Sequence, residues 1–266
     1  MSKPDVPAPA HWARRSFLAR TLGSAALLPL AGCDQLSKSD WFVAILDRAE
    51  TLTRTVQRAV TGKNALAPEY KEADLSKLFR ANGTTDPEDS AYQALAKAGF
   101  RDWRLEIGGL VEHPATLSLA ELRALPSRTQ ITRHDCVEGW SCIGKWKGVP
   151  LGAVLDRARP KPEARYVMFY CADPMEQTLD GSDSRYYESI DLAGAYHPQT
   201  ILAYEMNDAA LPTAYGAPLR LRDERQLGYK MAKYIMRIEL VESFANIRGG
   251  KGGYWEDQGY EWYAGI

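Results

Sequence analysis

The chain after Arg101 alternates short strand-like runs with turns and brief helical stretches, and this pattern limits the fold classes open to it. Residues 103–125 are predicted to form a strand, a turn and then a helix, in which Ser118 and Glu121 have the spacing of a capping box. The strict alternation of strand and helix that a doubly wound parallel sheet requires is absent from the sequence. The pattern therefore predicts an α+β fold with one principal domain.

Other segments have a local pattern that predicts an element of known type. Helices are predicted at 40–62, 89–100 and 149–160, the last ended by Pro160, and further strands at 129–140, 165–173, 198–207 and 217–224. Residues 66–90 are polar and rich in turn signals.

The overall composition excludes one class of partner. Of the 266 residues, 45% are hydrophobic and 25% are charged, and the formal net charge is −1. A near-neutral chain gives no electrostatic reason to bind nucleic acid, so we expect no nucleic-acid partner.

The first 33 residues have the composition of an export signal. Arg14 and Arg15 precede a short apolar run at 22–31, which is too short to span a bilayer. The arginine pair followed by Ser-Phe-Leu resembles a twin-arginine signal, and the run Leu-Ala-Gly-Cys ending at Cys33 resembles a bacterial lipobox. An ordinary secretory signal cleaved near Ala26 is the alternative.

This export signal predicts the location of the mature chain. The twin-arginine route exports proteins that fold before transport, often around a cofactor, so we expect a periplasmic protein that carries one. Lipidation at Cys33, with Asp34 beside it, predicts an anchor in the inner membrane.

The cysteine count leaves several chemistries open. Lipidation of Cys33 would leave Cys136, Cys142 and Cys171, so at least one thiol stays unpaired in an oxidising compartment. Zinc fits poorly, because the chain has no C-x-x-C pair and its histidines lack ligand spacing. The even separation of Cys136 and Cys142 allows them to share a sheet face, so a disulfide, a thiol–disulfide protein and a free thiolate all remain open.

The surroundings of Cys136 favour a reactive sulfur. Arg133 and His134 precede it, and Glu138 and Trp140 follow it. Nearby positive charge favours the thiolate, which binds soft metals and attacks electrophiles. From the residues alone, Cys136 is predicted to be either a metal ligand or a nucleophile.

Three segments, in order and spacing, resemble the sulfite-oxidase-type molybdopterin oxidoreductases. They are RHDCVEGWSCIGKWKGVPLGAVL at 133–155, YYESIDLAGAYHPQTILAYEMN at 186–207 and GAPLRLRDERQLGYKMAKYI at 216–235. The similarity covers roughly 66–266 and is greatest to the periplasmic branch that includes the methionine sulfoxide reductase catalytic subunit. It implies mixed sheets with flanking helices. The implied domains are a signal ending in a lipobox at 1–33, a linker and amphipathic helix at 34–65, and a molybdopterin-binding catalytic domain at 66–266.

The resemblance implies a role for each matching position. Cys136 is the implied thiolate ligand of molybdenum in a molybdenum–molybdopterin cofactor (Mo-MPT). Arg80 is implied to lie at the cofactor or substrate site. Arg80, Arg133 and His134 are expected either to steer an oxo-substrate or to be structural hydrogen-bonding residues. The implied cofactor contacts are Asn82, Cys171, Tyr215, Arg220, Lys230, Met231, Ala232 and Lys233. Among these, the arginine and the two lysines are implied to lie near the cofactor phosphate, which cations bind well.

The sequence also departs from the family pattern at the substrate side. Tyr215 stands where relatives have asparagine or histidine, and Thr85 and Asp86 stand where the reductase has a tyrosine–glutamate pair. The arginine-rich run that follows the cysteine of sulfite oxidases is replaced by VEGWS. Sulfite is therefore not assumed as the substrate.

The implied reaction is oxygen-atom transfer to or from a small oxo-donor or acceptor, as in a sulfoxide reductase. Because the chain has no C-x-x-C-H haem motif, electrons are expected from a membrane b-type haem protein. The absence of an immunoglobulin-like dimerisation domain implies a monomeric catalytic subunit. The alternatives are sulfite-oxidase-like oxidation of another small substrate and a non-catalytic periplasmic binding lipoprotein on the same fold.

Overall fold

The computed structural model describes residues 39–62, 65–176 and 184–266, so the predicted signal and lipobox lie outside the described residues. The chain divides after Thr53 into two units. Helix α3 (Asp40–Thr61) confirms the helix predicted at 40–62 and carries exposed apolar side chains, among them Trp41, Ile45 and Leu52. Within the described part of the chain, no helix combines the length and apolar character needed to cross a bilayer.

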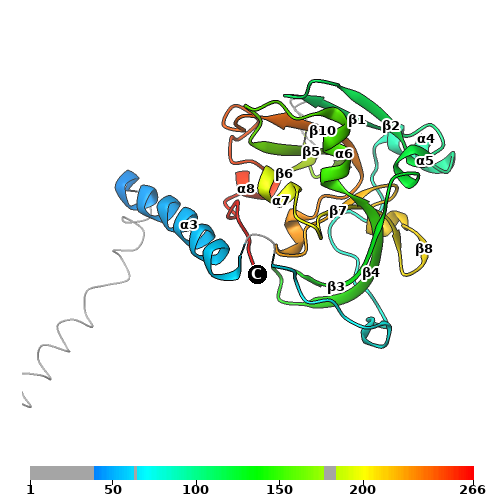
Figure 1. Ribbon diagram of the computed structural model, residues 1–266, viewed down its shortest axis with the longest axis horizontal. Coiled ribbons are helices and arrows are strands. Elements are labelled where there is room, and N and C mark those ends of the chain that lie inside the picture. Colours follow the sequence, from blue (N-terminus) through cyan, green and yellow to red (C-terminus); the bar gives the residue numbers. More distant parts are fainter. Residues whose placement is uncertain (1–38, 63–64, 177–183) are drawn as a thin grey trace, which may run out of the picture. The chain divides into compact units, whose positions relative to one another are not determined.

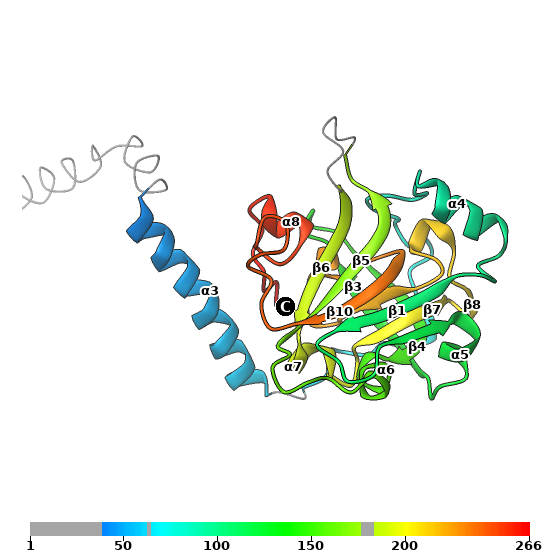
Figure 2. The same ribbon diagram turned by 90° about the horizontal axis from the view of Figure 1, so that it is seen from above.

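Two five-stranded sheets form the second unit (Figure 1). The first sheet has the order β2 (Ala115–Ser118), β1 (Arg104–Gly109), β10 (Ile235–Val241), β5 (Tyr166–Pro174) and β6 (Arg185–Asp191). The second contains β3 (Arg128–Asp135), β4 (Ser141–Pro150), β7 (Ile201–Met206) and β8 (Ala209–Ala210), with β9 (Arg220–Arg222) also paired to β7. Figure 2 shows β5 and β6 side by side in the first sheet.

The strand directions confirm the predicted fold class. β1 and β10 pair in parallel, whereas the other ladders are antiparallel. The first sheet is therefore mixed, and the helices that accompany the sheets are short. This is an α+β architecture, as predicted.

Several short helices connect the strands. They are α4 (Ser90–Lys97), α5 (Leu119–Arg123), α6 (Leu151–Ala158), α7 (Leu192–Ala195) and α8 (Tyr254–Asp257), with 3₁₀ turns η1 (Glu72–Asp74), η2 (Thr213–Tyr215) and η3 (Gly228–Lys230). The predicted capping box is present, because Ser118 Oγ accepts from Glu121 N and Glu121 Oε2 accepts from Ser118 N. Pro160 follows the end of α6, as expected.

One continuous apolar core joins the two sheets. It combines Ile107 and Ile238 of the first sheet with Val149 and Leu202 of the second and with Leu155 of α6, all at most 3% exposed. A smaller cluster on the second sheet includes Phe79, Trp146 and Met206. These two clusters hold the loops that lie at the ends of the strands.

The structure differs from the predicted strands in two respects. The strand predicted at 129–140 ends at Asp135, because a tight turn follows it, and the next strand begins at Ser141. β2, β6, β8 and β10 were not predicted. The sequence of β6 places the polar Glu188 and Ser189 at buried positions, which obscures the alternation of a strand.

Candidate active site

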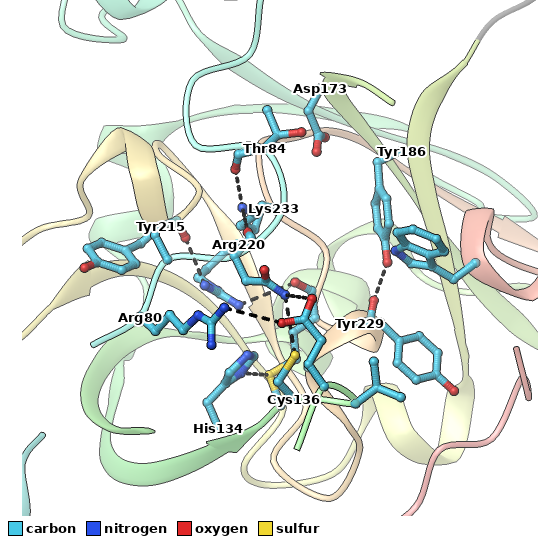
Figure 3. Close-up of a pocket in the computed structure, with 18 of the residues that line it drawn as sticks. Arg80, Thr84, His134, Cys136, Asp173, Tyr186, Tyr215, Arg220, Tyr229 and Lys233 are labelled. Atoms are coloured by element: carbon cyan, nitrogen blue, oxygen red, sulfur yellow. Dashed lines mark hydrogen bonds and ion pairs between the residues drawn. The ribbon is translucent and has the colours of Figure 1, made fainter. Parts of the chain in front are cut away.

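A pocket of about 210 Å³ forms where several loops meet (Figure 3). Its lining residues fall within segments far apart in the chain, namely 79–84, 134–138, 173–175, 214–220, 228–233 and 255–260, together with Tyr186. Both sheets contribute, since β3 leads into the segment with Cys136 and β5 and β6 provide Asp173 and Tyr186. The pocket thus combines one thiol, several cations and few acids.

The turn after β3 holds Cys136. Its N–H donates to Trp140 O at 2.9 Å, and Gly139 N–H donates to Cys136 O at 3.0 Å. Gly139 has a φ of +84°, which glycine adopts without strain. The Cys136 sulfur lines the pocket, and the Asn82 side-chain amide donates to it at 3.5 Å.

The described residues bear on the disulfide that the cysteine count left open. Cys136, Cys142 and Cys171 are all free thiols, so Cys136 and Cys142 form no disulfide. Cys142 is buried on β4, where its sulfur accepts from Arg80 N–H at 3.5 Å. Within 39–62, 65–176 and 184–266, no group of three or more His, Cys, Asp or Glu side chains is placed to hold a metal.

Glu138 organises the rim of the pocket beside Cys136. Its carboxylate accepts from Asn82 Nδ2 at 3.4 Å and from Trp140 Nε1 at 3.0 Å, and it lies 3.8 Å from an Arg80 nitrogen. The hydrogen bond from Trp140, then that from Asn82, lowers the pKa of Glu138. Arg80 stacks over the Trp140 ring at 5.1 Å. The rim therefore carries a balanced and solvent-exposed charge pair.

His134 is a neutral hydrogen-bond donor. Fully buried Arg222 lies 3.0 Å from His134 Nδ1. Because a guanidinium can only donate, Nδ1 accepts and the ring proton is on Nε2. Burial, followed by repulsion from Arg222 and Arg220, lowers the pKa of His134 well below its ordinary value. The ring packs on Gly228, where a Cβ would come within 2.4 Å of Nε2.

Arg220 provides a buried cation with unused hydrogen-bonding capacity. It donates to Tyr215 O at 3.0 Å and to Met231 O at 3.5 Å, and it stacks over Trp146 at 4.9 Å. Its Nε has no partner among the described residues. Burial and the nearby Arg222 lower the pKa of Arg220. An anion in the pocket would satisfy Nε and offset the repulsion between the two guanidinium groups.

Lys233 adds a second cation at the same end of the pocket. Its ammonium donates to Asn82 O at 2.8 Å and to Thr84 O, which fixes the 79–84 segment against the wall (Figure 3). Burial, then Arg220, lowers the pKa of Lys233, whereas burial raises that of Asp173 despite the attraction of Lys233. Within the described residues, Asp173 Oδ1 is buried without a partner.

The family model of the oxidoreductase molybdopterin binding domain matches residues 92–246, more than half of the chain. The chain belongs to this family. It is therefore an oxidoreductase, and the alternative of a non-catalytic binding lipoprotein is not supported.

Relatives of this oxidoreductase are named as sulfoxide reductases. The chain is 39% identical over 253 residues to "Putative protein-methionine-sulfoxide reductase subunit YedZ1" of Azospira oryzae, which covers 95% of this chain and 88% of the relative. It is 42% identical over 165 residues to the protein-methionine-sulfoxide reductase catalytic subunit MsrP of Xanthomonas axonopodis pv. citri, covering 59% of this chain. That match spans about half (49%) of the relative's length. The crystal structure of the sulfane dehydrogenase SoxCD from Paracoccus pantotrophus aligns with a TM-score of 0.48 at 24% identity, covering 56% of this chain and 40% of that chain.

The residues of the pocket fit the cofactor of a molybdopterin oxidoreductase. The unpartnered Nε of Arg220 and the ammonium of Lys233 suit a phosphate. The unpartnered Oδ1 of Asp173 is an acceptor that suits the N–H groups of a pterin ring. The sulfur of Cys136 is a soft donor facing the same space.

The structure brings most of the predicted site residues together. The pocket is lined by Arg80, Asn82, His134, Cys136, Tyr215, Arg220, Met231 and Lys233. Tyr215 contributes its backbone oxygen to Arg220 and its hydroxyl to Phe79 O at 2.7 Å, so it supports the wall.

Three predicted contacts do not line the pocket. Lys230 points away from it, and its ammonium lies between two buried carboxylates, those of Glu188 and Glu256. Ala232 is buried, with its oxygen accepting from Leu221 N–H at 2.8 Å. Cys171 faces the main apolar core, and burial raises the pKa of its thiol well above the ordinary value. The contacts of Lys230, Ala232 and Cys171 with the cofactor therefore stay predictions.

Several residues of the site were missed in the sequence. Asp173, Tyr186, Trp255 and Tyr260 line the pocket, and Arg222 sets the tautomer of His134. Arg222 could have been found from its place two residues after Arg220 on a strand, which puts both side chains on one face. The aromatic residues near the C-terminal end carry no local signal of a site.

Proposed function

We propose that the chain is a molybdenum-dependent oxidoreductase that removes an oxygen atom from a sulfoxide, with Cys136 as the protein ligand of the metal. One observation carries this proposal: the free thiol Cys136 and Arg220, whose buried Nε has no partner among the described residues, line the same pocket. A thiolate suits a soft metal and a buried guanidinium suits a phosphate, so the pair matches the two ends of Mo-MPT. The names of the relatives support a sulfoxide as substrate.

The side chains around the pocket supply binding and orientation. When bound, the cofactor supplies two-electron chemistry and oxygen-atom transfer. The tight turn at Gly139 and the Asn82 amide orient the Cys136 sulfur. The Nε2–H of neutral His134 is a donor for a ligand oxygen, because Arg222 occupies the other ring nitrogen. Trp255 and Tyr260 contribute aromatic rings to the pocket wall.

The mouth of the pocket suits a neutral substrate with one polar group. Val137, Trp255 and Tyr260 are apolar or aromatic, and aromatic rings make favourable contacts with thioether sulfur. At the rim of the pocket, the positive charge of the Arg80 guanidinium is already paired with the Glu138 carboxylate. Sulfite would need uncompensated positive charge at this rim, so the arrangement favours a sulfoxide over sulfite.

Measurements of enzymatic activity and of molybdenum and pterin content test this proposal. Matured protein should contain molybdenum and pterin in equal amounts, and reduced viologen should drive reduction of methionine sulfoxide and dimethyl sulfoxide. Sulfite with ferricyanide as acceptor tests the sulfite-oxidase-like alternative in a parallel assay. Protein that contains neither molybdenum nor pterin after correct maturation would contradict the proposal.

We further propose a periplasmic location and a membrane electron donor. The twin-arginine pair at Arg14 and Arg15 and the lipobox at Cys33 support export and anchoring, and the relatives' names as subunits support a separate partner. A membrane b-type haem protein is the donor we propose for the monomeric chain. Replacing both Arg14 and Arg15 with lysine should leave the protein in the cytoplasm. Cys33→Ala should release the exported protein from membranes. Cell fractionation measures the location of the protein in both cases.

A further inference from the structure

A buried charge cluster lies behind the pocket wall. Lys230 of η3 places its ammonium between Glu188 of β6 and Glu256 of α8, with the Glu256 oxygen 2.5 Å away. All three side chains are at most 1% exposed. The mechanism outlined above makes no use of this cluster.

The cluster must hold a proton to be stable. One ammonium and two ionised carboxylates would leave an excess negative charge away from water, which is costly. Burial, then repulsion from Glu256, raises the pKa of Glu188 well above its ordinary value. Burial alone would lower the pKa of Lys230, but the attraction of the two carboxylates outweighs it and raises that pKa. The ammonium therefore stays charged and one carboxyl is protonated.

Hydrogen bonds place this proton on Glu188 Oε2. Glu188 Oε1 already accepts from Lys230 and from Ser189 N–H at 2.7 Å, whereas Oε2 lies 3.3 Å from the Tyr186 hydroxyl. Glu256 Oε2 has no partner among the described residues, so a proton there would find no acceptor. Because the single Tyr186 hydrogen is donated to Tyr229 O, Tyr186 Oη is free to accept a proton held on Glu188 Oε2.

Tyr186 connects the cluster to the pocket. Its own hydroxyl hydrogen is donated to Tyr229 O, and both tyrosines line the pocket (Figure 3). The ordered chain is thus Glu188, then Tyr186, then the pocket. Because the Glu188 carboxyl can pass a proton to the Tyr186 hydroxyl, and this hydroxyl can pass its own proton on, the hydrogen-bonded pair can conduct a proton to the pocket.

We propose that Glu188 and Tyr186 form a proton relay that supplies one of the two protons consumed when the sulfoxide oxygen leaves as water. The relay rests on the proposed function. In the step, the Tyr186 hydroxyl turns from Tyr229 O toward the oxygen in the pocket, and its O–H bond breaks as the proton is transferred to that oxygen. The Glu188 proton then replaces it on Tyr186. Lys230 stabilises the carboxylate left behind.

The balance is that of sulfoxide reduction: R₂SO, two protons and two electrons give R₂S and water. An external one-electron donor, reduced viologen in the assay, supplies both electrons, and solvent supplies the second proton through the mouth of the pocket. Glu188 regains its proton along the same chain once product has left. The titratable groups that face Glu188 are Lys230, Glu256 and Tyr186, with Asp173 and Cys171 acting through Tyr186.

Kinetics of matched tyrosine variants test the relay. Tyr186→Phe should lower kcat for sulfoxide reduction roughly 100-fold, the usual scale of a lost general acid, with KM changed less than about twofold. The control is Tyr187→Phe, because Tyr187 donates to Asp257 and does not line the pocket, and it should keep the wild-type kcat. Glu188→Gln should show the same loss and a changed pH profile. Molybdenum and pterin contents should be equal in all variants.

Infrared spectroscopy gives a readout that needs no substrate. Holoenzyme should show the C=O band of a protonated carboxyl that shifts in D₂O, disappears in Glu188→Gln and changes frequency in Tyr186→Phe. Absence of this band from the wild type, or full kcat in Tyr186→Phe, would overturn the relay. Wild-type protein that contains molybdenum and pterin but reduces no sulfoxide would instead overturn the proposed function. The infrared band would still decide whether Glu188 stores a proton.

Discussion

The two cysteines of the β3–β4 hairpin have different surroundings. The Cys136 sulfur faces the pocket and receives the Asn82 amide at 3.5 Å. Cys142 is 8% exposed and packs in the apolar cluster with Phe79 and Trp146. Of this pair, Cys136 alone presents its sulfur to a ligand in the pocket.

Replacing Cys136 with serine should abolish sulfoxide turnover, because a hydroxyl is a poor substitute for a soft thiolate donor. Much of the pterin should stay bound, since Arg220 and Lys233 are unchanged. Viologen-linked turnover and pterin content measure the two effects. Cys142→Ser is the control and should keep its turnover while losing on the order of 1 kcal/mol of stability. Normal turnover in Cys136→Ser would contradict the ligand assignment.

Arg220→Gln should reduce the amount of cofactor retained. A charge-assisted hydrogen bond contributes about 1.5–3 kcal/mol, so affinity should fall roughly 10-fold or more. Pterin per chain, measured after dialysis, reports this loss. Arg237→Gln is the control, because Arg237 is paired with Glu239 and lies outside the pocket. Equal retention in both variants would remove Arg220 from the phosphate site.

At the scale of elements, the β3–β4 turn determines where the Cys136 sulfur lies. β3 and β4 pair from Arg128 to Asp135 in continuous register, so the hairpin is rigid up to the turn. The turn itself depends on Gly139, whose φ of +84° is unfavourable for other residues. The position of the sulfur therefore depends on one backbone conformation.

Gly139→Ala should destabilise the fold by about 1 kcal/mol and lower turnover more than this loss explains. A Cβ at this position meets no atom within 4 Å, so the effect comes from backbone strain. Urea unfolding and kcat measure the two consequences. Gly83, with a φ of +63° and an equally open Cβ position, offers a comparison for strain in another pocket loop. Stability and turnover both unchanged in Gly139→Ala would show that the turn does not position the sulfur.

Elements with local signals were predictable and those defined by tertiary contacts were not. The helices α4, α5 and α6 were predicted because their caps and stops lie within a few residues, as with Ser118 and Pro160. β6 could not be predicted, because Glu188 is buried only through its contact with Lys230, which is distant in sequence. For the same reason Lys230 was expected at the phosphate, although the structure pairs it with carboxylates.

At the scale of the whole molecule, the segment 65–69 is tied to the body by two polar side chains. Gln199 accepts from Ala67 N at 2.7 Å and donates to Ala67 O at 3.1 Å. His197 lies 3.1 Å from Ala65 O through Nε2 and accepts from Gln199 N–H on Nδ1. The ring is therefore neutral in the folded chain.

Stability should fall as the pH is lowered through the range where unfolded histidine titrates. Burial and Arg225 lower the pKa of His197 from 6.5 to about 4, so between these values the unfolded chain binds a proton that the folded chain does not. The loss should reach up to about 2 kcal/mol between about pH 7 and about pH 5. Urea unfolding at both pH values measures it, and His197→Gln should reduce the difference. An equal pH dependence in wild type and variant would contradict this assignment.

The candidate site was predictable where the family pattern is contiguous. Cys136, Arg220 and Lys233 were found from ordered segments, and all three line the pocket. Asp173 and Tyr186 were not found, because strand pairing alone brings β5 and β6 to this place.

The walls of the pocket come from residues 79 to 260, and this spread governs the timing of assembly. During translation, Cys136 leaves the ribosome long before Trp255 and Tyr260 exist. A nascent chain that ends before Trp255 therefore has an incomplete pocket. A group that needs the complete pocket can bind only after Trp255 and Tyr260 have been synthesised. Any chain that holds a group in this pocket is therefore one whose synthesis has passed Tyr260.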